Sequence, residues 1–319
     1  MIRLVTVAIP VYQELRYLPA TIQSVAAQDY PNIELLVSDN GMNGKRVPEI
    51  VAQNSSRSYR FRQNPATVPM HEHFNQLVQE ATGEYFVLLC DDDQISANFV
   101  TELVAVLERH PEASLAMSSQ ETIDESGSIT SKTVGPIPEI MSGEDCIRAW
   151  CSGQYAFNCP VTLLVKTTDL KDSGGYQGFI RGLFSDFGIL VRLCLGRHVA
   201  FNSNCVFRWR HHKSSLGHAS NYLEVAEACK QFLKYLDSEP KITAFAQAHP
   251  REWGRLRPHL VRFTWNVYFW SWLLLKDRGA SVLNLTKAAF AMPLIPAYYL
   301  RIFRSLLVVL IKPRHSLSH

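Results

Sequence analysis

Three consecutive carboxylates, Asp91, Asp92 and Asp93, directly follow the apolar run 86–90. Like charges at this spacing repel and raise one another's pKa, and a bound divalent cation removes that cost. Mg²⁺ and Mn²⁺ prefer carboxylate oxygens and commonly bind substrate phosphates as well. In an extended stretch, residues i and i+2 share a face, so we expect Asp91 and Asp93 to face one site together. The alternative is a solvated acidic turn that precedes a helix expected near 97–108.

The hydrophobic pattern of the first hundred residues predicts the elements that would position this cluster. Strands are expected at Leu4–Ile9, Ile33–Ser38, Tyr59–Gln63 and Tyr85–Cys90, and helices at Leu15–Gln28, Val47–Gln53 and His71–Ala81, the last closed by Gly83. This alternation predicts an α/β fold with a mainly parallel open sheet flanked by helices. Ligands of such sheets bind beyond the carboxyl ends of the strands, which is where residues 10–12, Asp39 and 91–93 fall.

The rest of the chain continues with strands and helices. Residues 124–144 are rich in glycine and proline and predict a loop or hairpin that lies over a site. Further elements are expected as strands at Val161–Lys166 and Val199–Phe207 and as helices at Asp145–Cys151, Asp186–Leu195 and Asn221–Leu236. We therefore divide the chain into an α/β domain, 1–220, and a helical C-terminal region, 221–319.

The formal net charge of +3 over 319 residues is the sum of two parts with opposite charge. Residues 251–319 carry a net charge of +9, which leaves −6 for the rest, and this distribution argues against a nucleic-acid-binding domain. The aromatic segments 260–275 and 288–311 are interrupted by charged residues or proline, so neither offers the about 20 apolar residues of a membrane span. They fit helices that lie in a membrane interface and contact anionic lipid. The alternative is a helical subdomain packed on the α/β core or on a second subunit of a homo-oligomer.

The cysteines and the N-terminus bear on the cellular compartment. Seven cysteines occur without C-x-x-C spacing, which argues against a disulfide framework or a zinc ribbon and fits a reducing environment. The N-terminal apolar run is too short for a signal peptide and lacks a small-residue cleavage site. We expect a cytoplasmic protein at the inner face of the cell membrane.

The order of these segments resembles that of the family 2 glycosyltransferases of GT-A fold. Thr6–Tyr12 resembles the opening strand and nucleotide loop of that family, and Ile33–Asp39 resembles its second strand. Residues 81–85 resemble the run before its metal motif, and 91–93 stand where it has D-x-D. The resemblance covers residues 4–216. It implies an inverting transferase that moves a sugar from a UDP- or dTDP-sugar to a hydroxyl of a saccharide or polyprenyl-linked saccharide, in surface polysaccharide synthesis.

The resemblance also implies roles for individual residues. Asp39 would accept a hydrogen bond from the N3–H of uracil or thymine. The other residues that would surround the nucleotide are Pro10, Val11, Tyr12, Glu14, Asp91 and Asp92. Asp93 would hold Mn²⁺ or Mg²⁺ on the diphosphate, with Asp91 and His212 as further ligands. Arg210 would bind a phosphate oxygen, and a basic surface turn is the alternative for its segment.

Three positions depart from the family pattern. Asn40 and Met42 stand where the family often has a carboxylate and a hydroxyl after its second strand. Cys90 occupies the first place of the common L-D-x-D-D form. Which of the three aspartates contacts the metal is therefore open.

Asp186 is the candidate base for the acceptor hydroxyl. In the family this base opens a helix after a glycine turn, and here Gly174–Tyr176 precedes Asp186, with Ser185 in place of the common glutamate. The alternative is that Asp186 only caps the helix. Other functions are a non-catalytic nucleotide-sugar-binding or assembly protein of the same fold, and a nucleotidyltransferase. Residues 10–15 lack the glycine-rich, basic phosphate loop that the last would need.

Overall fold

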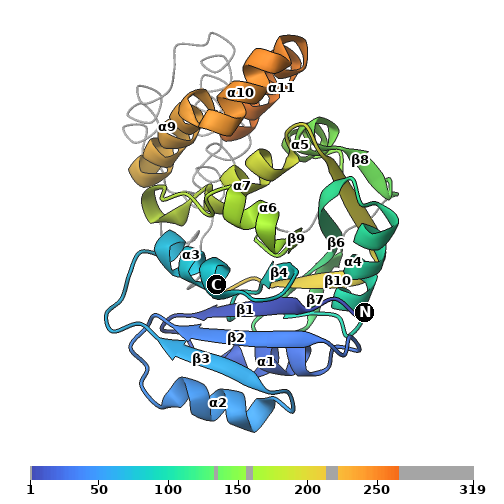
Figure 1. Ribbon diagram of the computed structural model, residues 1–319. Helices are drawn as coiled ribbons and strands as arrows, with labels where there is room; N and C mark the ends of the chain where they lie inside the picture. The colour runs from blue at the N-terminus through green and yellow to red at the C-terminus, as the bar shows by residue number, and fades with distance from the viewer. Residues whose placement is uncertain (1, 133–135, 156–160, 213–221, 266–319) are drawn as a thin grey trace, which may run out of the picture.

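A computed structural model describes residues 2–132, 136–155, 161–212 and 222–265 (Figure 1). One sheet runs through these residues, in the order β3-β2-β1-β4-β9-β6-β10-β5. Its strands are β1 (Val5–Val11), β2 (Ile33–Asp39), β3 (Tyr59–Gln63), β4 (Tyr85–Leu88), β5 (Gln94–Ile95), β6 (Ala113–Ile123), β9 (Leu164–Lys166) and β10 (His198–Arg210), with β7 (Ile129–Lys132) beside β6 and β8 (Ile140–Ser142) beside β10.

The long strands of the sheet share one direction. Strands β3, β2, β1 and β4 pair in parallel, and β6 pairs in parallel with β10. The short strand β9 is antiparallel to both β4 and β6, so the two groups point the same way. The carboxyl ends of β1, β2, β4, β6 and β10 therefore lie at one edge of the sheet, where α/β proteins bind ligands.

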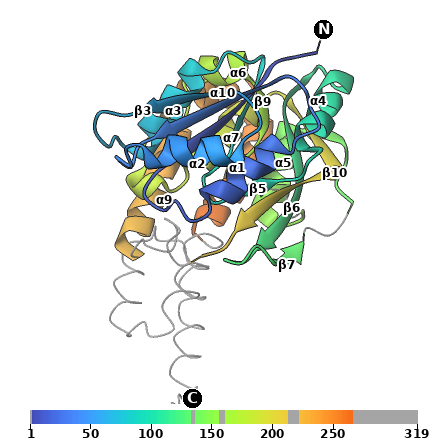
Figure 2. The same cartoon turned by 90° about the horizontal axis from the view of Figure 1, so that it is seen from below.

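Helices cover both faces of the sheet (Figures 1 and 2). One face carries α1 (Leu18–Ala26), α2 (Arg46–Asn54) and α4 (Phe99–Arg109), and the other carries α3 (Met70–Glu80), α5 (Gly143–Ser152), α6 (Thr167–Asp172) and α7 (Ser185–Cys194). Side chains alternate along a strand, so Val7 and Ile9 pack with α1 while Ala8 belongs to the opposite core. Burial on both sides explains why the residues of β1 are apolar except for Thr6.

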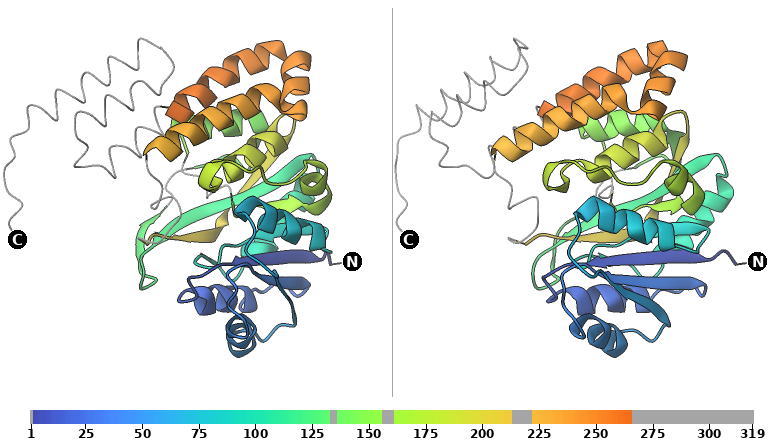
Figure 3. Two further views of the ribbon diagram at one scale, coloured as in Figure 1. Left: turned by 90° about the vertical axis from the view of Figure 1, so that its left-hand side faces the viewer. Right: turned by 60° about the vertical axis from the view of Figure 1, so that its left-hand side comes forward.

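The C-terminal helices α9 (Tyr222–Ser238), α10 (Pro240–Ala248) and α11 (Pro250–Arg262) form a layer outside α5 and α7 (Figure 3). Phe232 and Leu260 are buried in the same hydrophobic cluster as Phe86 of β4. Residues 222–265 are therefore packed on the α/β core. The segment 288–311 and most of 260–275 lie outside the described residues. Across the described ranges, no helix is long and apolar enough to cross a bilayer.

The structure confirms the mainly parallel α/β sheet, although some expected element ends shift. Strand β6 and helix α6 were not expected. Gly83 does not close α3, which ends at Glu80. A Cβ at Gly83 would lie 2.5 Å from the Thr6 nitrogen, so this glycine lets the turn before β4 approach β1. Cys90 lies beyond β4, which ends at Leu88, and this places Cys90 in the turn that carries the carboxylates.

Candidate active site at the carboxyl ends of the strands

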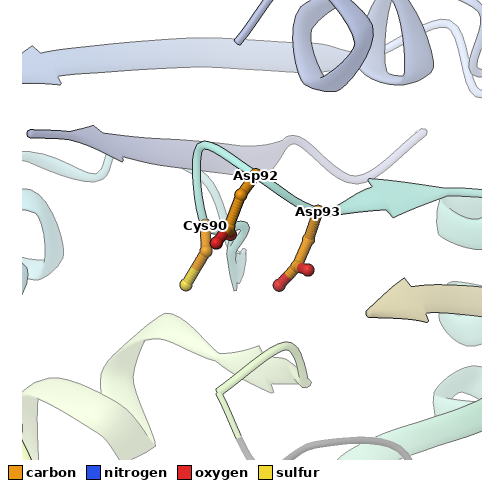
Figure 4. Close-up of side chains that lie close together, drawn as sticks. All are labelled: Cys90, Asp92 and Asp93. Carbon is orange, nitrogen blue, oxygen red and sulfur yellow. The ribbon is translucent and has the colours of Figure 1, made fainter. Parts of the chain in front are cut away.

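The acidic cluster forms a tight turn after β4. The Asp93 N–H donates to the Cys90 carbonyl at 3.2 Å, which closes the turn. The expected pairing of Asp91 with Asp93 on one face assumed an extended stretch, and it does not hold because the chain turns here. Instead, ligand atoms of Cys90, Asp92 and Asp93 lie within 4.8 Å of one another, and the three side chains project to the same side (Figure 4).

Asp91 connects the turn to the end of β1. Its carboxylate accepts a hydrogen bond from the Tyr12 N–H at 3.0 Å. The Thr21 hydroxyl of α1 lies 3.0 Å from the Asp91 carbonyl and 2.8 Å from the Asp93 carbonyl. Through these contacts Asp91 connects the acidic turn to Tyr12, which belongs to the expected nucleotide loop. Asp91 is not one of the three residues whose ligand atoms converge.

Arg210, at the end of β10, is buried against the same turn. Its main-chain N–H donates to the Asp93 carboxylate and its Nε donates to the Asp92 carbonyl, both at 2.8 Å. Its Nη1 donates to the Asp124 carbonyl at 2.8 Å, and the guanidinium lies 4.6 Å from the centre of the Tyr17 ring. Arg210 is 2% exposed, and these contacts show that its guanidinium stabilises the turn. The expected contact with a phosphate oxygen stays a prediction.

His212 contacts Asp92. Its Nε2 lies 2.8 Å from Asp92 Oδ2, and its ring packs on Tyr17 with centroids 5.0 Å apart. The hydrogen bond to Asp92 raises the pKa of His212. With Nε2 engaged in this way, His212 orients Asp92, as residues behind a metal ligand commonly do.

The electrostatics of the turn favour a bound cation. Burial, together with the charge of Asp92, raises the pKa of Asp91 to about 7 and holds the pKa of Asp93 well above its usual range. A divalent cation would offset this burial and repulsion. Two carboxylates and a thiol are a donor set that accepts Mn²⁺ and related divalent ions. The residues present therefore fit a metal, with Asp92 in the place that was expected for Asp91.

Asp39, at the end of β2, builds the loop that follows it. Its carboxylate accepts hydrogen bonds from the main-chain N–H groups of Gly41 and Asn43 and from the Asn43 side chain, each at 2.8 Å. Asp39 is 0% exposed. In this geometry the loop uses the Asp39 carboxylate, and a contact with uracil or thymine, which stays a prediction, would need the loop to rearrange.

Asn40 ties the same loop to the segment after β3. Its side chain donates to the Val68 carbonyl at 2.9 Å, accepts from the Val68 N–H at 3.0 Å and accepts from Asn64 at 2.9 Å. An amide both donates and accepts, which a carboxylate does not. These bonds account for an asparagine at a position where the family often has an acid.

The remaining nucleotide candidates differ in exposure. Pro10 and Val11 are buried within β1, whereas Tyr12 is 45% exposed just beyond it. Glu14 is exposed and accepts from the Arg16 N–H at 3.0 Å. The Tyr12 ring is therefore accessible to a base, while Pro10 and Val11 contribute to the core beneath it.

Asp186 lies in the first turn of α7. Its carboxylate accepts from the Phe187 N–H at 2.8 Å. The N-cap position of α7 belongs to Phe184, so Asp186 is not the capping residue. Phe184, just before the helix, has a φ of +67°, a conformation that is strained for a bulky residue. The Phe184 ring stacks on Phe232 of α9 at 4.7 Å, so the C-terminal layer holds this strained residue beside the candidate base.

The glycine turn before α7 is fastened by two helices. Asn75 of α3 accepts from the Tyr176 N–H at 2.7 Å and donates to its carbonyl at 2.9 Å. Gly175 has a φ of +73°, and a Cβ there would lie 2.1 Å from Asn75 Oδ1. Arg192 of α7 donates to the Gly175 carbonyl, and its Nη1 lies 3.6 Å from Glu239, the N-cap of α10.

Comparison with known proteins agrees with this architecture. The sequence profile described as glycosyl transferase family 2 matches residues 6–170, more than half of the chain. The chain belongs to this family. An uncharacterized glycosyltransferase of Rickettsia conorii is 29% identical to this chain over 127 residues, which are 39% of this chain and 20% of the relative. An uncharacterized protein of Sinorhizobium fredii matches over 14% of its own length, so the match spans a small part of these relatives.

Two solved structures share the fold of this glycosyltransferase. S. aureus TarS 1–349 in complex with UDP-GlcNAc has a TM-score of 0.61 at 13% identity, covering 91% of this chain and 82% of that one. A mannosyltransferase from Pyrobaculum calidifontis in complex with GDP-Man and Mn²⁺ has a TM-score of 0.53 at 16% identity, covering 97% of this chain and 87% of that one. At these identities the likeness shows the GT-A fold.

The structure adds two residues to the site that the sequence predicted. Cys90 stood out only as a departure from the family motif, although its i, i+2 spacing to Asp92 was a usable signal. Tyr17 contacts both Arg210 and His212, and nothing in the sequence distinguished it from an ordinary aromatic before a helix.

Proposed function

We propose that this glycosyltransferase takes a UDP- or dTDP-sugar as donor and acts with Mn²⁺ or Mg²⁺. Its acceptor would be a hydroxyl of a saccharide or polyprenyl-linked saccharide in surface polysaccharide synthesis. The observation that carries the proposal is the convergence of Cys90, Asp92 and Asp93 at the carboxyl end of β4, joined through Asp91 to the exposed Tyr12. The UDP-GlcNAc complex of TarS supports a uridine donor.

Each step of the transfer has a candidate residue. Tyr12 stacks on the base. A cation held by Asp92 and Asp93 would neutralise the diphosphate as its bond to the sugar C1 breaks. Asp186 accepts the proton of the acceptor hydroxyl while that oxygen bonds to C1 from the opposite face, which inverts the anomeric configuration. Arg210 fixes the two aspartates of the turn through its hydrogen bonds.

A donor screen by calorimetry tests the proposal. UDP, dTDP and GDP are titrated with and without Mn²⁺ into the full chain and into Asp92→Asn. We expect UDP or dTDP to bind only with Mn²⁺, and we expect Asp92→Asn to abolish this binding. Binding of GDP alone would contradict the assigned donor class.

The acceptor side is tested separately. Asp186→Asn should retain donor binding and lower turnover by about 10²–10⁴-fold, the usual contribution of a general base. Full activity of this variant would show that another group accepts the proton and that Asp186 only stabilises the first turn of α7.

Two variants distinguish the roles open to Asp39. Asn43→Ala removes one of its hydrogen-bond partners without changing the carboxylate, and Asp39→Asn removes the charge. If Asp39 acts by shaping the loop, both variants weaken UDP binding. If it reads the base after a rearrangement, only Asp39→Asn does.

We also propose that the C-terminal region, 221–319, contacts the inner face of the cell membrane through its aromatic segments 260–275 and 288–311. The support is the net charge of +9 over 251–319 and the aromatic segments within it. In liposome flotation, the full chain should float with anionic vesicles, and a chain ending at 265 should stay with the soluble fraction. Equal behaviour of the two chains would contradict membrane contact.

A further inference from the structure

Three different donor groups converge in the turn after β4. Cys90, Asp92 and Asp93 each offer one ligand atom, and these atoms lie within 4.8 Å of one another. Figure 4 shows the sulfur and the carboxylate oxygens projecting to the same side of the turn. The set combines one soft donor, the Cys90 sulfur, with two hard donors, the carboxylate oxygens of Asp92 and Asp93. It therefore differs from a site made of oxygen ligands alone.

The backbone fixes the position of the thiol. The Leu89 N–H donates to the Ala8 carbonyl of β1 at 2.9 Å, and the Cys90 carbonyl accepts from the Asp93 N–H at 3.2 Å. Cys90 is therefore held between a strand of the sheet and a closed turn. It is partly exposed, whereas Cys146, Cys151, Cys194, Cys205 and Cys229 are buried.

We propose that the Cys90 thiolate is a direct ligand of the metal, and that it shifts the preference of the site from Mg²⁺ toward thiophilic ions. This inference rests on the proposed function only in using the same metal site. When the metal binds, the S–H bond of Cys90 breaks, a sulfur–metal bond forms and the proton goes to solvent. Carboxylates alone favour Mg²⁺ and Mn²⁺, whereas thiolate ligands favour Zn²⁺, Cd²⁺ and Co²⁺.

The hydrogen bonds of the turn orient its carboxylates, and the positions of the ligand atoms decide the set. The Asp91 carboxylate accepts from the Tyr12 N–H at 3.0 Å, and Asp91 is not among the three residues whose ligand atoms lie within 4.8 Å of one another. The Asp92 carboxylate is oriented by His212 at 2.8 Å, and Asp93 by the Arg210 N–H at 2.8 Å. Each carboxylate of the set is therefore oriented by one hydrogen bond. The Cys90 thiol is the third group whose ligand atom lies within 4.8 Å of these carboxylates.

Metal titrations without donor or acceptor test the inference. Co²⁺ added to the reduced full chain should produce a near-ultraviolet thiolate-to-cobalt charge-transfer band at one equivalent. By calorimetry, Cys90→Ser should lower the affinity for Cd²⁺ about tenfold or more and change the affinity for Mg²⁺ less than about threefold. Cys90→Ser should also abolish the cobalt band.

Matched variants of the same turn serve as controls. Asp91→Asn should keep the cobalt band, because Asp91 lies outside the three donors. Asp92→Asn should weaken Cd²⁺ and Mg²⁺ alike, because it removes a ligand that both ions use. Circular dichroism and the melting temperature identify any variant that fails to fold, and Cys90→Ala replaces Cys90→Ser in that case.

The outcomes separate this inference from the proposed function. A cobalt band that is absent, or that persists in both Cys90 variants, overturns the thiolate ligand. Binding of UDP with Mn²⁺ would still support the proposed donor site in that case. A cobalt band without any nucleotide binding would support the mixed metal site and contradict the donor assignment.

Discussion

The buried imidazole of His73 predicts that the folded protein loses stability as the pH falls. His73 lies on α3 at 3% exposure, and its Nε2 is 2.8 Å from the Ser38 hydroxyl of β2. Burial, with a smaller contribution from the positive charge of Arg62, lowers the pKa of His73 to about 4. The folded protein therefore keeps this histidine neutral at pH values where the unfolded chain protonates it.

The sign and the size follow from linkage. The unfolded histidine has a pKa near 6.5, so between pH 6.5 and about 4 the unfolded chain binds more protons and folding stability falls with the pH. The full shift corresponds to about 3 kcal/mol, present above pH 6.5 and lost by about pH 4. Between pH 7 and pH 5, the contribution of His73 to this loss is about 2 kcal/mol.

Urea unfolding of the wild type and His73→Gln at pH 7 and pH 5 measures this contribution. Gln lacks the titrating group, so its loss of stability over this interval should be smaller by about 2 kcal/mol. The double difference cancels the carboxylates and the other histidines, which titrate in both proteins. Equal losses in the two proteins, within about 0.5 kcal/mol, would refute the assignment of a low pKa to His73.

The remaining predictions concern packing around the acceptor side. Gly175→Ala should lower the free energy of unfolding by about 2–4 kcal/mol, because the new methyl group meets Asn75 in a left-handed conformation; a loss below about 1 kcal/mol in chemical denaturation would contradict this. Arg192→Met should lower the free energy of unfolding by about 3–5 kcal/mol, because it leaves the Glu239 carboxylate without its ion-pair partner. Adding Glu239→Gln should restore part of this stability. Additive losses in the double-mutant cycle would show that the two residues do not interact. Phe232→Ala should cost about 3–5 kcal/mol and lower turnover, and wild-type stability would show that α9 is not part of the core.

The N-terminal half of the fold was predictable because strands such as β1 and β4 are buried on both faces. The run 85–90, for example, is apolar throughout and is followed by Asp91, and both features can be read directly from the sequence. Strand β6 was missed because Ala113–Ile123 contains three serines among its apolar residues, which weakens the pattern. Its place in the sheet depends on pairing with β10, which lies far along the chain.

The site was predictable in position but not in detail. The sequence located the acidic cluster and Asp39 at the carboxyl ends of β4 and β2, and the structure places them there. It could not show that residues 90–93 form a turn, which places Asp92 instead of Asp91 in the candidate metal group. Nor could it show that Arg210 and Asp39 use their polar groups on nearby main chain, because those contacts depend on the tertiary fold.

The dependence of the turn on Arg210 has a consequence for synthesis on the ribosome. The main-chain N–H that fixes the Asp93 carboxylate belongs to a residue 117 positions later in the chain. At about 5–20 residues per second, the ribosome needs about 6–23 seconds to add that partner. During this interval the first parallel strands can pair, but the acidic turn lacks its hydrogen bond from β10. The nascent chain therefore completes the acidic turn only after much of the sheet beneath it has been synthesised.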